Sequence, residues 1–418
     1  MQQLHKKFID SQIKELFEKY LANNIPRIYI QNILGIKERR FFHLLKKYKT
    51  DPQKFSIQYL RKSVTRKISQ HIEKNINIEL IDEQKLINDP DIPINFYNYS
   101  FIQKTLKEKY NQIVSVPTII DRAKKQGFYI NKPKKKYHDH EVLTNYIGQL
   151  IQHDSSHHKF SSYANEKWYL ITSLDDFSRF ILYAVLILKE TSVAHISALE
   201  SVLTEYGFPT SYYVDSHSIF RFVQGRDSLY RTHYLLTDDA DTQFKQVLDD
   251  CNVKLIYALS AQAKGKIERP YSWIQEYLVR ICSKEHISDL STAQDVLKNL
   301  ISQYNHKWVH STTKEIPFIR FQNAKINNLS LFREFKIKPP FISPKDIFCH
   351  RINRVTDPYR KISLNNLKFS IKDTNPHDTV NLRIYPLDSL FSEIRFWSNN
   401  KLVDVQNIKN SDLQGLQY

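Results

Sequence analysis

The stretch WYLITSLDDFSRFILYAVLIL, residues 168–188, decides the fold class. It holds two apolar runs rich in β-branched and aromatic residues, 168–174 and 180–188, with the turn sequence DDFSR between them. Runs of this length and composition around a short polar turn are typical of an antiparallel hairpin. We therefore expect two neighbouring strands of a sheet here.

The flanking segments extend this hairpin to a mixed α/β domain. A short strand is expected at 150–154, and apolar runs at 211–214 and 253–258 predict two more. A helical pattern at 191–206 ends at a glycine, and a long helix is expected from about 264 to 283. Three strands followed by helix, strand, helix, strand and helix is the order of a ribonuclease-H-like fold, a mixed sheet with helices on its faces.

Length, composition and cysteine content indicate a multidomain cytoplasmic protein. The chain has 418 residues, 41% of them hydrophobic, which suffices for two to four domains. Its cysteines, Cys251, Cys282 and Cys349, are odd in number and far apart, so they predict neither a disulfide framework nor a cysteine-based zinc site. Residues 1–10 lack a signal-peptide pattern and no apolar run reaches membrane-spanning length, so we expect no membrane partner.

The net charge of +17 lies on the flanks of the chain. Residues 1–140 hold 28 Lys and Arg against 14 Asp and Glu, a balance of +14. Residues 141–330 have a balance of −2 and residues 331–418 one of +5. Basic flanks favour binding to phosphates because counterions are released. A solvated basic surface is the plain alternative, and the content of the neutral middle decides between them.

The first 57 residues predict a helix-turn-helix unit. A helical pattern at 12–22 is followed by apolar positions up to Leu34, then Gly35 and a basic helix. That second helix is expected to bury Phe41, Phe42, Leu44 and Leu45. The residues of this unit predicted to contact DNA are Lys37, Arg39 and Arg40. An ordinary helical hairpin remains open for this segment alone.

A similar unit recurs within residues 58–129. Ser100 is expected to cap a helix that ends at Tyr110, and Ser115 to cap a second helix that ends at Gly127. The basic residues of this second helix, predicted as further DNA contacts, are Arg122, Lys124 and Lys125. Two such units in tandem favour DNA binding over accidental hairpins.

The remaining flanks predict a linker and a β-rich domain. Residues 130–140 are basic, polar and contain proline, as expected of a linker. Residues 331–418 contain a hairpin pattern at 361–370 around Asn365-Asn366 and alternating runs beyond it. Several short strands with turns between them predict a small barrel that binds DNA or supports assembly. The core itself is expected to cover residues 141–325.

Three acids stand at strand ends or a helix start of the predicted core. Asp154 is expected to end the first strand and Asp215 the fourth, while Glu268 lies in the first turn of the long helix. The spacings are 61 and 53 positions. In a ribonuclease-H-like fold the first and fourth strands are neighbours, so the three carboxylates converge. Each acid alone is more often a turn or cap residue, so the order and spacing carry the prediction.

Clustered carboxylates repel one another unless cations compensate them. Two Mg²⁺ ions, with Mn²⁺ as an expected substitute, suit hard oxygen ligands and drive in-line displacement at phosphorus. On the helix that bears Glu268, the residues expected to border the metals and contact DNA are Lys264, Lys266 and Arg269. Charge compensation for Glu268 alone is the other interpretation of these three cations.

The motifs around these acids resemble the integrase-core (rve) superfamily of DDE transposases and retroviral integrases. The matching stretches are IQHDSSHH around Asp154, ITSLDDFSRF, Gly207-Phe208-Pro209, TQF at 242–244 and AQAKGKIER at 261–269. The segment DSHSIF that begins at Asp215, followed by TQF and QAKGKIER, is most similar to bacterial insertion-sequence transposases of the ISNCY type. The resemblance covers about residues 140–325. It implies a structural turn at Asp175 and Asp176, with Arg179 paired to an acid there.

The chain also departs from the pattern of that superfamily. Ser216-His217 stands where many members have Asn-Gly, and Ala261 replaces a common proline. The insertion between the second and third acids holds rival metal ligands, namely Asp227, Asp238, Asp239 and Asp241. These rank below Asp215 because they follow no apolar strand. His153, His157 and His158 are interpreted as polar residues near DNA rather than as a zinc site.

Together these features predict a DNA transposase that cleaves the 3′ ends of its element and transfers them to target DNA. Its expected partners are double-stranded DNA, both terminal inverted repeats and target, and a second copy of itself in a homodimer or higher oligomer. We expect it in the bacterial cytoplasm, associated with the nucleoid. The alternatives are a catalytically decayed or domesticated transposase acting as a DNA-binding regulator, and a nuclease of the same fold that cuts without joining.

Overall fold

The computed structural model describes residues 4–58, 68–131, 144–215, 219–220, 242–258, 265–365 and 367–413, and of residues 265–270 the backbone alone. Within these, the chain divides into two compact units, residues 1–74 and 75–418. None of the helices in the described ranges combines the length and apolar character needed to cross a membrane.

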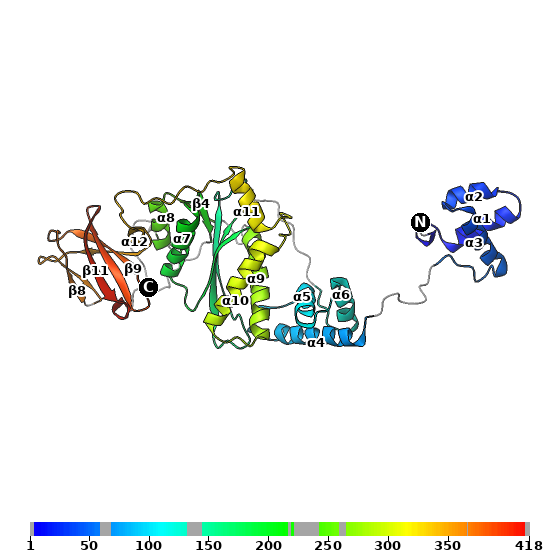
Figure 1. Ribbon diagram of the computed structural model, residues 1–418, viewed down its shortest axis with the longest axis horizontal. Helices are drawn as coiled ribbons and strands as arrows, with labels where there is room; N and C mark the ends of the chain where they lie inside the picture. Colours follow the sequence, from blue (N-terminus) through cyan, green and yellow to red (C-terminus); the bar gives the residue numbers. More distant parts are fainter. Residues whose placement is uncertain are drawn as a thin grey trace, which may run out of the picture. The chain divides into compact units, whose positions relative to one another are not determined.

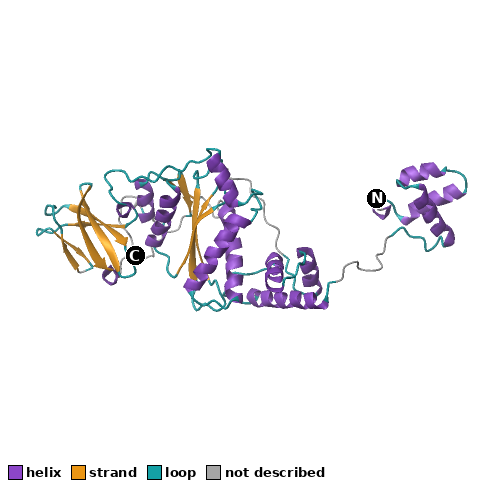
Figure 2. Cartoon of the chain, in the orientation of Figure 1, coloured by secondary structure: helices purple, strands orange, loops and turns teal. Residues whose placement is uncertain are grey.

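The N-terminal unit is a small helical bundle (Figure 2). Its helices are α1 (Asp10–Leu21), α2 (Arg27–Leu34) and α3 (Glu38–Thr50). Phe17 of α1 packs edge to face on Phe41 of α3, with ring centroids 5.7 Å apart, at the centre of the core. Gly35, with φ of +62°, ends α2 in the left-handed conformation that glycine adopts at low cost.

The predicted helices and glycine turn of this unit are present, whereas their identity as a helix-turn-helix stays a prediction. One burial prediction is wrong: the side chain of Phe42 is 44% exposed, whereas its neighbour Phe41 is fully buried. Phe42 instead packs on Phe41 and under the guanidinium of Arg27, 5.6 Å from the ring centroid. The buried stripe of α3 consists of Phe41, Leu44, Leu45 and Tyr48, and position 42 lies outside it.

Three helices precede the central sheet: α4 (Gln70–Ile87), α5 (Tyr99–Tyr110) and α6 (Val116–Lys125). Ser115 caps α6 as predicted, accepting a hydrogen bond from the backbone N–H of Thr118. The predicted cap of α5 is wrong, because Asn98 rather than Ser100 accepts from the backbone N–H of Phe101. The helix α4 is not predicted from the sequence, because polar residues are interspersed among its apolar positions.

A five-stranded mixed sheet forms the centre of the second unit, in the order β3-β2-β1-β4-β5. The strands are β1 (Ile151–His158), β2 (Trp168–Asp175), β3 (Ile181–Ile187), β4 (Ser211–Val214) and β5 (Lys254–Tyr257). β1, β2 and β3 pair antiparallel, whereas β4 runs parallel to both β1 and β5. The predicted hairpin, the mixed sheet and the adjacency of the first and fourth strands are confirmed.

Helices cover both faces of this sheet (Figure 1). On one face lie α7 (Ser192–Tyr206) and α8 (Gln243–Asp250), whose buried Leu199 and Phe244 join a core with Ile151 of β1. On the other lie α9 (Gly265–Lys284) and α10 (Leu290–Lys307), whose Leu278 and Leu297 join a core with residues of β2. The helix α11 (Pro317–Ile326) follows.

Gly207, in the Gly207-Phe208-Pro209 motif, is required by a close backbone approach. Its φ is +97°, and a Cβ atom there would lie 2.3 Å from the carbonyl oxygen of Arg333. Phe208 and Arg333 exchange backbone hydrogen bonds of 2.8 and 2.9 Å across this contact. Only a residue without a side chain lets the two segments meet just before β4, the strand that precedes Asp215.

The C-terminal part begins with the short helix α12 (Pro344–Ile347) and is otherwise β. Its strands are β6 (His350–Val355), β7 (Lys361–Leu364), β8 (Leu367–Ser370), β9 (Thr379–Pro386), β10 (Phe391–Ser398) and β11 (Lys401–Lys409). The hairpin predicted at 361–370 is present as the β7-β8 pair. The predicted closed barrel is not confirmed, because four strands form an open sheet in the order β11-β10-β9-β6.

Candidate active site

Asp154 lies on β1, and Asp215 directly follows β4, the parallel strand next to it. Ile151 of β1 is opposite Tyr212 of β4, so that paired residues are 61 positions apart. Asp154 and Asp215 are separated by the same 61 positions. The β1–β4 pairing ends at Gln152 and Tyr213, two residues before the aspartates, and the same register extended would bring the two aspartates opposite each other. Both side chains are partly exposed.

Asp154 lies in the middle of β1, and its predicted place at the end of the strand is wrong. The strand continues to His158, because residues 154–158 pair in register with residues 168–172 of β2. Asp215 directly follows β4, as predicted. The difference matters for the site, because a mid-strand position fixes the backbone of Asp154 on both sides.

The helix that carries the third acid contacts β1 at Asp154. Tyr271 of α9 donates a hydrogen bond to the main-chain carbonyl of Asp154. The Tyr271 side chain is buried, and this burial together with the nearby charge of Asp154 holds its pKa well above the usual value. Glu268 precedes Tyr271 by three residues in the same helix.

Several predicted site residues lie outside the described part of the chain. Lys264 is not described, and of Lys266, Glu268 and Arg269 only the backbone is, within the first turn and a half of α9. The four rival metal ligands, Asp227, Asp238, Asp239 and Asp241, also lie outside the described residues.

The chemistry of the aligned donors fits a divalent cation. Partly exposed carboxylates that lie close together repel each other, and hard cations such as Mg²⁺ bind such oxygens. Among the described residues, no group of three or more His, Cys, Asp or Glu side chains could hold a metal ion. The side chain of Glu268, the third predicted ligand, lies outside the described part of the chain, so the preceding statement does not cover it.

Asp175 and Asp176 are buried in the β2–β3 turn, where they stabilise the backbone. Asp175 accepts hydrogen bonds of 2.8 Å from the N–H groups of Gly148 and Ser178, and burial raises its pKa to about 6. Asp176 pairs with Arg179 at 2.9 Å. This is the pairing that the resemblance implied. The hydrogen bond from Gly148 to Asp175 also ties the turn to the segment that leads into β1.

The histidines near Asp154 differ in their surroundings. His153 is fully buried and hydrogen-bonded to Ser173 and His195, so its interpretation as a polar residue near DNA is wrong. His157 is exposed and stacks on Tyr169, with ring centroids 3.9 Å apart. No spacing in the sequence revealed the contact between His153 and His195, because it joins a strand to a helix 42 residues away.

The helices before the sheet are anchored to α9. Arg280 of α9 and Glu83 of α4 have fully buried side chains and form an ion pair of 2.8 Å. Asn98 donates a hydrogen bond of 2.9 Å to Glu276, and Phe101 packs edge to face on Tyr277. The α4–α6 region therefore belongs to the same packed body as the helix that bears Glu268.

The predicted DNA contacts of α6 lie on its surface. Lys124 and Lys125 are exposed, and Arg122 is partly buried. Lys125 and Arg122 both pair with Asp121, at 2.9 and 2.6 Å. Lys124 lies 4.7 Å from the centre of the Tyr129 ring. Their surface positions are compatible with contacts to phosphates.

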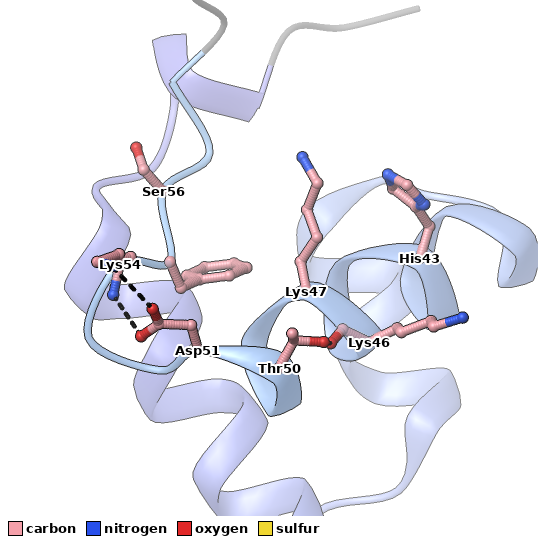
Figure 3. Close-up of a pocket in the computed structure, with 8 residues that line it drawn as sticks. His43, Lys46, Lys47, Thr50, Asp51, Lys54 and Ser56 are labelled. Carbon is pink, nitrogen blue, oxygen red and sulfur yellow. Dashed lines mark hydrogen bonds and ion pairs between the residues drawn. The ribbon is translucent and has the colours of Figure 1, made fainter.

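The N-terminal unit presents a second basic surface, a pocket of about 530 Å³ beside α3 (Figure 3). Lys47 extends between His43 and Ser56, and Lys54 turns toward Asp51 (Figure 3). The predicted contacts Lys37, Arg39 and Arg40 belong to the other end of α3, where Lys37 and Arg39 are exposed. The sequence analysis did not single out His43 or Lys54. The loop after α3 brings Lys54 back through backbone hydrogen bonds to Asp51.

Sequence comparisons relate the chain to transposases. It is 26% identical over 177 residues, 42% of its length, to the "Putative transposase y4bF" of Sinorhizobium fredii. It is 28% identical over 232 residues, 56% of its length, to the transposase for insertion sequence IS1202 of Streptococcus pneumoniae. The chain spans 37% and 47% of the lengths of these two relatives. No protein-family model matches it.

Solved structures with a partial resemblance come from retroviral integrases. The catalytic core domain of HTLV-2 integrase in complex with magnesium aligns with 41% of this chain and 95% of its own, at 19% identity and a TM-score of 0.30. A chain of the simian T-cell lymphotropic virus intasome aligns with 73% of this chain and 97% of its own, at 14% identity and a TM-score of 0.35. By sequence, this chain is thus similar to transposases over about half of its length.

Proposed function

We propose that this protein is a DDE-type DNA transposase, most similar to those of ISNCY-type insertion sequences. It would bind the terminal inverted repeats of its element and hydrolyse one strand at each end to free a 3′-hydroxyl. That hydroxyl would then attack a phosphorus atom of target DNA, forming a new phosphodiester and releasing a target 3′-oxygen. The sequence similarity to two transposases supports this reaction class.

The observation that carries the proposal is the register of β1 and β4. Extended two residues beyond its last pair, this register would bring Asp154 opposite Asp215, because the paired residues and the two acids share one spacing of 61 positions. The contact of Tyr271 with the Asp154 backbone brings the Glu268-bearing helix to the same point. A chance pair of turn aspartates would have no reason to match the strand register.

In this proposal Asp154, Asp215 and Glu268 hold two Mg²⁺ ions, for which Mn²⁺ substitutes. When bound, such a metal pair activates the attacking hydroxyl and stabilises the leaving 3′-oxygen. The mid-strand backbone of Asp154, which is paired to Thr172 of β2, would keep its carboxylate in place. Lys264, Lys266 and Arg269 would contact the DNA near the scissile phosphate.

The basic flanks would hold the DNA. Lys37, Arg39 and Arg40 of the N-terminal unit and Arg122, Lys124 and Lys125 of α6 would contact the element ends, in helix-turn-helix fashion. The open C-terminal sheet would contribute to DNA binding or assembly. Because two ends must be joined together, the working form would be a dimer or larger assembly on nucleoid DNA in the cytoplasm.

A strand-transfer assay with labelled element ends tests the proposal. Wild type is compared with Asp154→Asn, Asp215→Asn and Glu268→Gln, each with Mg²⁺ and with EDTA. We expect metal-dependent joining by wild type and none by the variants, while end binding persists in all. These substitutions remove charge but keep the size of the side chain, so a folded variant reports on the metal ligands.

The other outcomes separate the alternatives. End binding without cutting or joining by wild type would favour a DNA-binding regulator derived from a transposase. Cutting without joining would favour a nuclease of the same fold. Full activity of one variant would move the missing ligand to the insertion that holds Asp238, Asp239 and Asp241.

A further inference from the structure

A buried chain of hydrogen bonds runs behind Asp154. His153 of β1 bonds through Nδ1 to Ser173 Oγ of β2, at 2.9 Å. Its Nε2 lies 2.8 Å from Nδ1 of His195 in α7. The Nε2 of His195 lies 2.9 Å from the carboxylate of Glu190, which also accepts a hydrogen bond from Ser155. These hydrogen bonds connect β1, β2 and α7 with Glu190, the residue before the N-cap of α7.

One arrangement of protons satisfies every member of this chain. Ser173 donates to His153, His153 donates from Nε2 to His195, and His195 donates from Nε2 to ionised Glu190. Both imidazoles are then neutral, and each accepts at Nδ1. Both histidine side chains are fully buried and Glu190 is 11% exposed. Polar groups at such depth are costly unless their hydrogen bonds are made, so the network favours one geometry.

Aromatic rings hold the two histidines on the side of α7 and α8. The ring of Phe244 stacks on His153 at 5.3 Å, and that of Phe220 packs edge-on against His195 at 5.0 Å. Phe220 lies five residues after Asp215, and its carbonyl accepts a hydrogen bond of 3.0 Å from Tyr257. The network thus touches the segment that follows the second acid.

The residues before and after Asp154 in the sequence both belong to this network. Successive side chains of a strand point to opposite faces, so His153 and Ser155 share one face of β1 and Asp154 projects from the other. Through Ser173 and Glu190, the neighbours of Asp154 on both sides are tied to β2 and to the start of α7. A shift of these hydrogen-bonded side chains would move the backbone of Asp154 relative to Asp215.

We propose that His153, His195 and Glu190 are positioning residues that set the separation of the Asp154 and Asp215 carboxylates, and through it the affinity of the site for divalent metal. The inference rests on the proposed function, because it takes the two aspartates as metal ligands. None of the three touches substrate, and their effect passes through the β1 backbone and Phe220. Substitution of groups that orient metal ligands commonly lowers metal affinity about 10–100-fold.

Binding of Mn²⁺ to the full-length protein without DNA, measured by titration calorimetry, tests the inference. His195→Phe keeps an aromatic ring but removes both hydrogen bonds, and we expect about tenfold weaker Mn²⁺ binding. His195→Gln can still accept from His153 and donate to Glu190, so its affinity should stay within about threefold of wild type. This rescue by the conservative variant is not expected of a ring that only fills space.

Leu199→Ala supplies the matched control. Leu199 is fully buried one turn further along α7, in the core that α7 shares with β1. Its truncation lowers stability without touching the network, so Mn²⁺ affinity should not change. Equal affinity of folded His195→Phe and wild type would overturn the inference. If His195→Phe does not fold, Glu190→Gln decides in its place, with weakened binding expected and unchanged binding contradicting the inference.

A fourth variant separates this inference from the proposed function. Asp154→Asn should abolish the Mn²⁺ site of the wild type. If wild type shows no Mn²⁺ binding that depends on Asp154, the proposed metal site itself is wrong and the inference falls with it. If that binding exists and His195→Phe leaves it unchanged, only the positioning role is refuted.

Discussion

At the scale of single residues, Asp175 links pH to stability. Burial raises its pKa to about 6 from an ordinary 3.8. The protonated form is therefore favoured in the folded state, and its stabilisation is complete below about pH 4 and lost as the pH rises through 6. Relative to Asp175→Asn, which does not titrate, wild type should lose about 2 kcal/mol of unfolding free energy between pH 4 and pH 7.5.

Urea unfolding of both proteins at several pH values measures this difference. Asn299→Ala on α10 is the control, because Asn299 is exposed and does not titrate, so the substitution should give no pH-dependent difference from wild type. If the difference in unfolding free energy between wild type and Asp175→Asn stayed constant from pH 4 to pH 7.5, burial would not raise the pKa of this carboxyl as expected.

Gly207 supplies a second prediction at this scale. Gly207→Ala would force a Cβ to within 2.3 Å of the Arg333 carbonyl, so β4 and the segment at 333 must separate. Gly127 also has positive φ, +81°, but nothing lies within 4 Å of its would-be Cβ. Thermal unfolding should therefore show a loss of about 1 kcal/mol for Gly127→Ala and about 3 kcal/mol for Gly207→Ala. Equal losses would contradict the close approach.

At the scale of elements, the α4–α9 contact depends on a fully buried ion pair. Arg280→Met leaves Glu83 charged and unpaired in the core, and should cost about 3–5 kcal/mol of unfolding free energy. The double variant Arg280→Met/Glu83→Leu removes both charges, so it should recover most of that loss. The exposed pair of Lys298 and Asp295 on α10 is the control, and Lys298→Ala should change little. A double variant as unstable as Arg280→Met would show that packing, not charge, holds the helices.

Which elements the sequence predicts follows from where their stabilisation comes from. The hairpin of β2 and β3 could be predicted because its apolar runs bury themselves. The second half of β1, from Ser155 to His158, is polar and reads as a loop, but it forms a strand because β2 pairs with it and the buried network satisfies Ser155. The strand β6, with the sequence HRINRV, is also polar and was not predicted, because its pairing with β9 makes it a strand.

The candidate site divides along the same line. Asp154, Asp215 and Glu268 could be proposed as site residues because motif and spacing can be read directly from the sequence. The pairing of His153 with His195, and of Arg280 with Glu83, depends on side chains that only the folded chain brings together, across 42 and 197 residues. Sequence patterns of helices and strands contain no information on such distant contacts.

At the scale of the whole molecule, the charge distribution predicts how DNA binding responds to salt. The two flanks carry charges of +14 and +5 against −2 in the middle, and each phosphate neutralised by a lysine steepens the loss of affinity with salt. In the pocket beside α3, no described residue forms an ion pair with Lys46 or Lys47, so both charges are available to phosphates. Asp51, the acid of the pocket, instead pairs with Lys54 at 3.8 Å.

The double variant Lys46→Ala/Lys47→Ala should therefore weaken binding to element ends and to unrelated duplex DNA by similar factors. The slope of log Kd against log salt should fall by about 0.9 for each lost phosphate contact, hence by about 2. Lys298→Ala, which removes a lysine already paired with Asp295, should leave the slope unchanged. Fluorescence anisotropy at several salt concentrations measures both quantities. A variant that loses affinity only for element ends, at constant slope, would instead make these lysines readers of base sequence, because base contacts carry specificity without counterion release.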